Sequence, residues 1–165
     1  MAERSELPIR GVVPIAEMRG EDSDESELFL LAAKAAKDYL EAFPWCKHIL
    51  ESYFGDGIGG VVEIFCFRIA PSHPNVDEWF WVIVGDLPPA YLVTDDCRTP
   101  SEALEDYITQ LSAWVHLARQ GRSSSDVIRV GVAPTPDNAA ELDKRIRFLR
   151  DFALPRFRDG ETERA

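Results

Sequence analysis

The sequence predicts an α+β fold: an antiparallel meander of three strands, with a fourth strand left open, one or more helices before it and two C-terminal helices after it. Three apolar runs follow one another at short spacing, and helical periodicity is confined to the segments before and after them. The runs are Val61–Ile69, Glu78–Val84 and Ala90–Val93. Their links are too short for a crossover helix, so neighbouring strands are expected to be antiparallel.

The length indicates one domain. A chain of 165 residues with 45% hydrophobic residues can bury a core without disulfides or metal. We expect an irregular N-terminal arm over residues 1–25, a single α+β domain over residues 26–158 and a C-terminal tail over residues 159–165.

The segment before the meander has a helical pattern. It predicts a helix over Ser26–Ala42 whose inner face carries Leu28, Leu31, Ala32, Ala35 and Tyr39. Pro44 would end this helix. Trp45–Phe54 is then expected to be a short second helix, ended by the glycines at positions 55, 57, 59 and 60.

The run Trp79–Val84 shows no alternation of apolar and polar residues. A strand of this kind is usually buried on both faces, so we expect it to be the central strand. Trp79 and Trp81 would project from the same face.

Two helix starts can be read after the meander. Thr99-Pro100-Ser101-Glu102 combines a threonine cap, a proline in the first turn and a glutamate three residues after the cap. The helix it opens should end at Gly121. A similar start at Thr135-Pro136 predicts a last helix, which Pro155 would end.

Composition excludes several functions. Eighteen Lys and Arg against 29 Asp and Glu give a net charge of −11, which disfavours binding to nucleic acids and to anionic membranes. The longest apolar run has six residues, too few to cross a bilayer. Three widely spaced cysteines form neither a disulfide framework nor a zinc site, so we expect a cytoplasmic protein without a cofactor.

The motif search does not yield a complete catalytic set. The glycine-rich segment 55–60 precedes a strand, whereas phosphate loops follow one. Cys46 and His48 are two positions apart and would not face each other on a helix. His73-Pro74-Asn75 resembles a signature of ubiquitin-conjugating enzymes, but in that family the meander comes before the motif. A plain proline turn accounts for the segment.

Carboxylates gather at one edge of the predicted meander, where the first strand ends, the second begins and the third ends. The expected partner-binding residues there are Asp77, Glu78, Asp95, Asp96, Trp79 and Trp81. Carboxylates held together repel one another unless a cation neutralises them. The sequence therefore favours a non-enzymatic module for a protein with a basic surface, with bacterial immunity or inhibitor proteins as one concrete form.

Two alternatives stay open. His73, Asp77, Asp95 and Asp96 are residue types that would serve a small metal-assisted enzyme or ligand-binding protein at the same edge. Glu141–Arg158 carries six basic residues against three acidic ones. This segment could pair with the acidic segment Glu21–Glu27, either within the chain or between two copies in a homo-oligomer.

Overall fold

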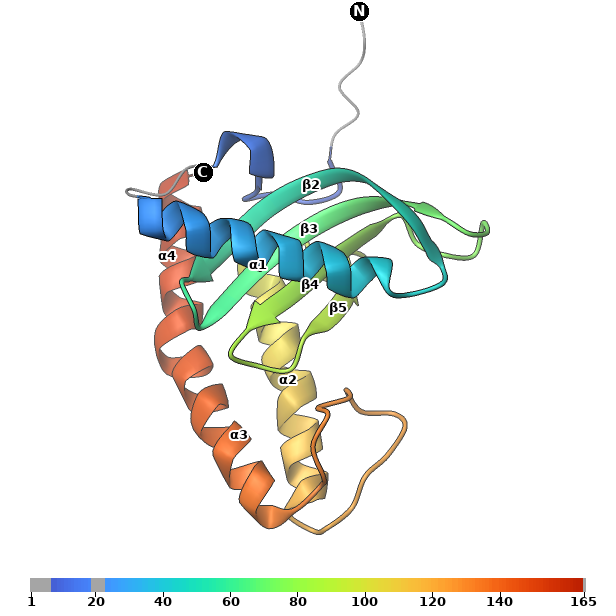
Figure 1. Ribbon diagram of the computed structural model, residues 1–165. Coiled ribbons are helices and arrows are strands. Elements are labelled where there is room, and N and C mark those ends of the chain that lie inside the picture. Colours follow the sequence, from blue (N-terminus) through green and yellow to red (C-terminus); the bar gives the residue numbers. More distant parts are fainter. Residues whose placement is uncertain (1–6, 19–22, 165) are drawn as a thin grey trace, which may run out of the picture.

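A computed structural model describes residues 7–18 and 23–164. The elements, in chain order, are β1 (Val13–Pro14), η1 (Ile15–Glu17), α1 (Ser23–Glu41), β2 (Cys46–Ile58), β3 (Val62–Pro71), β4 (Trp79–Gly85), β5 (Ala90–Val93), α2 (Pro100–Ala118), α3 (Pro136–Phe148), the π-helical turn η2 (Leu149–Ala153) and α4 (Leu154–Arg164). The strands form one sheet in the order β1-β2-β3-β4-β5, and each neighbouring pair is antiparallel (Figure 1).

The α+β class and the antiparallel meander are confirmed, but the sheet has five strands rather than three or four. The additional strands are β1, contributed by the arm, and β2. The expected short helix over Trp45–Phe54 was wrong. β2 has three register irregularities against β3, which shift its side chains out of regular alternation. Because its apolar and polar residues do not alternate regularly, the sequence pattern of β2 did not indicate a strand.

Two glycines that were expected to stop a helix instead allow β2 to pack closely. A side-chain carbon at Gly55 would lie 3.0 Å from the carbonyl oxygen of Ile64 and 3.0 Å from Cγ of Pro100. At Gly57 it would lie 2.8 Å from Cγ of Glu63. Both positions therefore require glycine for close approach. Gly60, with φ of +77°, lies in the turn between β2 and β3.

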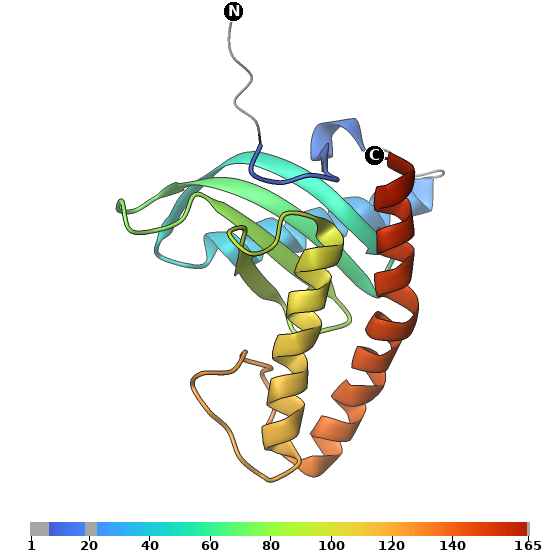
Figure 2. The same ribbon diagram turned by 180° about the vertical axis from the view of Figure 1, so that it is seen from behind.

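Helices cover both faces of the sheet. α1 crosses one face, and α2 lies with the long α3–α4 helix on the other (Figures 1 and 2). Each face has its own apolar core. Phe65, Phe67 and Phe80 face α1, whereas Trp81 and Ile83 face α2 and α4. None of the described helices is long and apolar enough to span a membrane.

The expectation that Trp79–Val84 is buried on both faces holds from Phe80 to Val84. Its assignment as the central strand was wrong, because β1 and β2 extend the sheet on the far side of β3. β3 is the middle strand, and its residues from Val62 to Phe67 are buried.

The inner face of α1 also differs from the prediction. Ala33, Ala36 and Leu40 are buried, whereas Leu28 and Leu31 are 52% and 60% exposed. Leu28 to Ala33 is apolar at every position, so periodicity could not select a face. The aromatic contacts select it: the ring of Phe29 packs on those of Phe54 and Phe65, at centroid distances of 5.1 and 5.9 Å.

Both predicted threonine caps are present. The hydroxyls of Thr99 and Thr135 accept hydrogen bonds from the backbone N–H groups of Glu102 and Asn138, each at 3.2 Å. The capped helices α2 and α3 each begin with proline, and Gly121 follows α2 with φ of +67°. These starts and the end at Gly121 are confirmed.

The predicted end at Pro155 was wrong. The N–H of Leu154 bonds to the carbonyl of Leu149, five residues back, and this wider π turn admits a proline without breaking the helix. The helix then continues to Arg164, through most of the expected tail. Phe157, which lies beyond the proline, is fully buried and gives the extension its core contact.

The arm and α4 meet at the start of α2. The Glu161 carboxylate accepts hydrogen bonds from the N–H and the hydroxyl of Ser101, at 2.7 and 2.6 Å. The N–H of Arg10 donates to the carbonyl of Arg98 at 2.7 Å, and Ile9 is buried. Both chain ends thus hold the segment between β5 and α2. Residues 1–6 and the acidic positions 21 and 22 lie outside the described part.

The first prediction concerns α4. Phe157→Ala should destabilise the protein by about 3–5 kcal/mol, because it empties a filled core position. The matched change Phe152→Ala removes a ring that is 49% exposed and should cost under about 1 kcal/mol. Urea unfolding of both variants measures the difference. Equal losses would show that α4 does not pack as described.

Candidate functional site

The predicted carboxylates leave the sheet at one end but form two separate groups. Phe80 lies opposite Val93, so the segments before β4 and after β5 emerge together. Asp95 and Asp96 continue towards α2, whereas Asp77 and Glu78 lie in the β3–β4 connection. The turn expected around Pro74 is present, since the N–H of Val76 bonds to the carbonyl of His73.

Glu78 is held by an arginine rather than by the other predicted carboxylates. Arg68 pairs with Glu51 at 2.9 Å and with Glu78 at 3.3 Å. Arg68 and the hydroxyl of Tyr53 both donate to Glu51 and lower the pKa of its carboxyl group. Burial, followed by the bond to Glu51, raises the pKa of Tyr53 to about 12. Glu51 and Glu78 therefore share one guanidinium group, and the three side chains together keep one negative charge.

The second group forms an acidic hollow at the beginning of α2. The hollow measures about 300 Å³ and is lined by Asp96, Cys97, Glu102, Glu105, Asp106 and Thr109. Asp95, which is exposed, adjoins it in the sequence. The carboxylates on the first turns of α2 are near the positive end of the helix dipole, which helps to hold them together. Arg158 of α4 contacts Glu105 at 3.0 Å.

The two predicted tryptophans do not form an exposed surface. Trp81 is fully buried, and its indole N–H donates to the carbonyl of Cys97 at 2.7 Å. Trp81 therefore cannot touch a partner, which corrects the prediction, but it fixes the backbone at the hollow. Trp79 is half-buried, with its ring 5.9 Å from that of Tyr53. The cause is the two-sided cover of the sheet, which removes most aromatics from solvent.

The cysteines are unsuited to nucleophilic chemistry. All three are buried thiols. Burial, with a further contribution from Asp106, raises the pKa of Cys97 to about 12, and burial also raises the pKa of Cys46 and Cys66. A thiol must ionise to attack, so these groups stay inert near neutral pH.

The residues also do not assemble a metal site. Within residues 7–18 and 23–164 there is no group of three or more His, Cys, Asp or Glu side chains that could hold a metal ion. His73 and Asp77 are exposed on the β3–β4 connection, and Asp96 lines the hollow at α2. The metal alternative therefore has no geometric support in the described part of the chain.

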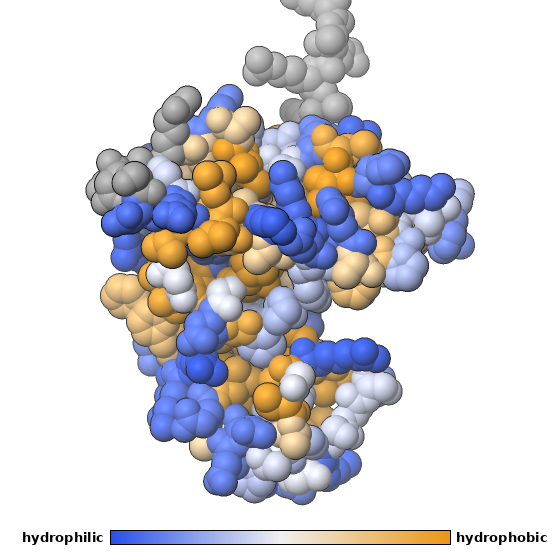
Figure 3. Space-filling model, viewed as in Figure 1, coloured by the Kyte–Doolittle hydropathy of each residue, from blue (hydrophilic) through white to orange (hydrophobic). Residues whose placement is uncertain are grey.

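Less acidic hollows lie elsewhere on the described part of the chain. A groove of about 800 Å³ runs along β5, between aromatic side chains that include Tyr39, Phe43 and Tyr91 and the loop over residues 128–131. Figure 3 shows the surface hollowed between the sheet and the loop that precedes α3. The groove walls are mostly apolar. The residues that line the groove are distant from one another along the chain, so no sequence pattern predicts it.

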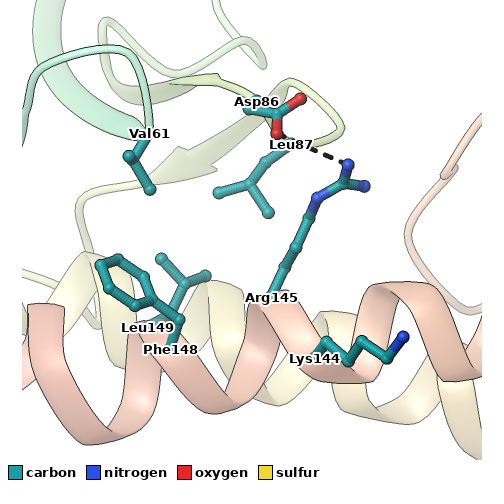
Figure 4. Close-up of a pocket in the computed structure, with 7 residues that line it drawn as sticks. All are labelled: Val61, Asp86, Leu87, Lys144, Arg145, Phe148 and Leu149. Atoms are coloured by element: carbon teal, nitrogen blue, oxygen red, sulfur yellow. Dashed lines mark ion pairs between the residues drawn. The ribbon is translucent and has the colours of Figure 1, made fainter.

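A smaller hollow, of about 270 Å³, lies between the sheet and α3 (Figure 4). Apolar side chains of Val61, Leu87, Phe148 and Leu149 point into it. Arg145 pairs with Asp86 at 3.5 Å across its rim. The pair links α3 to the turn after β4.

Sequence reasoning missed most of the acidic hollow. It identified Asp96 but not Glu102, Glu105 and Asp106. The signal was present, because positions i, i+3 and i+4 of a helix share one face. Thr99, which caps the helix that carries this face, lies only three residues after Asp96. The sequence alone could therefore have placed Asp96 beside the three carboxylates of the helix.

The chain has no significant match among protein-family models, curated protein sequences or solved structures.

Glu63 is a buried carboxylate on β3 and yields the second prediction. It is 7% exposed, and burial raises its pKa from 4.5 to about 7. The folded state thus holds this proton more tightly than the unfolded state. The resulting stabilisation is complete below about pH 4.5 and is lost as the pH rises through about 7.

Glu63→Gln should remove that dependence. The free energy of unfolding of the variant, relative to the native sequence, should increase by on the order of 3 kcal/mol between about pH 4.5 and pH 8. Urea titrations across this range provide the measurement. Parallel pH profiles for the two proteins would show that Glu63 is charged in the fold.

Proposed function

We propose that this protein is a non-enzymatic protein-binding module whose acidic hollow holds a basic segment of another protein. The observation that carries the proposal is the hollow itself: four carboxylates from the β5–α2 segment and α2 line one concave surface. The chain as a whole has a net charge of −11, which attracts basic partners at long range.

The spacing of the carboxylates supports a side-chain cation over a metal ion. Too few of them converge to coordinate one ion among the described residues. A hollow of about 300 Å³ has room for the end of an arginine or lysine side chain. Guanidinium groups donate to several carboxylates at once. The cap at Thr99 fixes the start of the helix that carries three of these carboxylates.

The backbone from Cys97 to Ser101, which leads into the hollow, is also held by hydrogen bonds from the protein core and from α4. Trp81 fixes the carbonyl of Cys97, and Glu161 fixes Ser101. A binding surface that is already ordered loses little conformational entropy when a partner docks. This support favours a site that is preformed in the free protein.

An inhibitor of a basic toxin, as in bacterial immunity proteins, is one concrete form of this module. Such inhibitors neutralise a basic surface by charge complementarity. The three buried, unpaired thiols fit a reducing compartment such as the cytoplasm.

The third prediction tests the hollow with matched charge changes. Asp96→Asn with Asp106→Asn removes two charges from the hollow. Asp137→Asn with Glu141→Gln removes two from α3, whose start lies near the far end of α2 (Figure 2). Partners co-purifying with each tagged protein from the native lysate are identified and quantified, and their dissociation constants are measured at two salt concentrations.

The hollow variant should bind the partner at least about tenfold more weakly and with a smaller salt dependence, whereas the α3 variant should bind nearly normally. Thermal unfolding establishes that both variants fold. Equal retention of the partner by the two variants, or loss by both, would refute the assignment of the hollow.

A further inference from the structure

Three leucines on α1 are exposed together. Leu28, Leu30 and Leu31 are 52%, 61% and 60% exposed. They lie within four consecutive positions near the start of the helix. Figure 3 shows apolar surface over this part of α1. We call these three side chains the leucine patch.

The leucine patch is not explained by packing within the chain. α1 already places Phe29, Ala33, Ala36 and Leu40 on the sheet. A single exposed leucine is ordinary on a protein surface, but several adjoining ones usually mark a contact surface. A helix segment that is apolar on all sides is normally buried on all sides. The side of α1 that carries the leucine patch is not covered by any other of the described residues.

The charges around the leucine patch suit a second copy of the same helix. Leu31 lies roughly opposite the buried line of Ala33, Ala36 and Leu40. Glu27 stands one turn before Leu31 and Lys34 one turn after it, and both are exposed. Acidic residues therefore flank one end of the leucine patch, and the Lys34–Asp38 ion pair flanks the other.

An antiparallel pairing of two such helices brings unlike charges together. Rotation about a two-fold axis near Leu31 places Glu27 of each subunit beside Lys34 of the other. Lys34 already contacts Asp38 of its own helix at 2.5 Å, with 73% of the lysine side chain exposed. Its ammonium group has further donors for a second carboxylate. A parallel pairing would instead set like charges side by side.

We propose that the leucine patch is a homodimer interface, in which α1 packs antiparallel against α1 of a second copy. Burial of the six leucines drives the association. The two Glu27–Lys34 contacts fix the direction, and they offset locally the repulsion between two chains of net charge −11. This surface is separate from the acidic hollow, so both can be occupied at once.

The fourth prediction concerns the oligomeric state of the full chain, measured by sedimentation equilibrium over a range of concentrations. The native sequence should be a dimer, and Leu31→Glu should weaken the dimer at least about 100-fold. The matched variant Val132→Glu, at a residue that is 53% exposed in the loop before α3, should remain dimeric. Circular dichroism establishes that each variant folds.

A charge exchange tests the pairing itself. Glu27→Lys and Lys34→Glu should each weaken their own dimer about tenfold, because each sets like charges opposite one another. A mixture of these two variants should form a heterodimer, since both contacts are then complementary. A native protein that is monomeric at every concentration would overturn the proposal. So would a dimeric Leu31→Glu variant, or a mixture no more associated than its components.

Discussion

The two-sided burial of β3 and β4 is the constraint on which the rest of the structure depends. Alternate residues of both strands enter two different apolar cores. A sheet of this kind is stable only when each face is covered by a separate layer. α1 therefore has to lie on one face, and α2 with α4 on the other. The positions of the acidic hollow and of the leucine patch both follow from this requirement.

On the α2 face, the same requirement shapes the hollow. Trp81 brings its indole into the core and bonds to the carbonyl of Cys97. The chain then reaches α2 within three residues, which leaves Asp96 beside the carboxylates of the first helical turns. On the other face, only one side of α1 can pack against the sheet. Its segment Leu28–Ala33 is apolar on all sides, so covering the sheet with one side leaves the leucines exposed on the others.

The sequence was sufficient where a local signal had one physical meaning. Thr99-Pro100 and Thr135-Pro136 specify helix starts because a hydroxyl suits the N-cap position and a proline suits the first helical position after it. It was insufficient where tertiary contacts decided. β2 lost its alternation through register shifts, and Pro155 was accommodated by a π turn. Periodicity could not choose the buried face of α1, and Trp81 could not be placed without knowing that helices cover both faces.

Site-resolved amide hydrogen exchange tests the two-sided core most directly. Amides that are paired within β3 and β4 can exchange only when both layers separate, so they should be the slowest in the protein, close to the limit set by global unfolding. Amides of β5, at the sheet edge, and of the loop between α2 and α3 should exchange much faster. If the amides of β3 and β4 exchanged as rapidly as those of β5, the account of a sheet held between two helical layers would be contradicted.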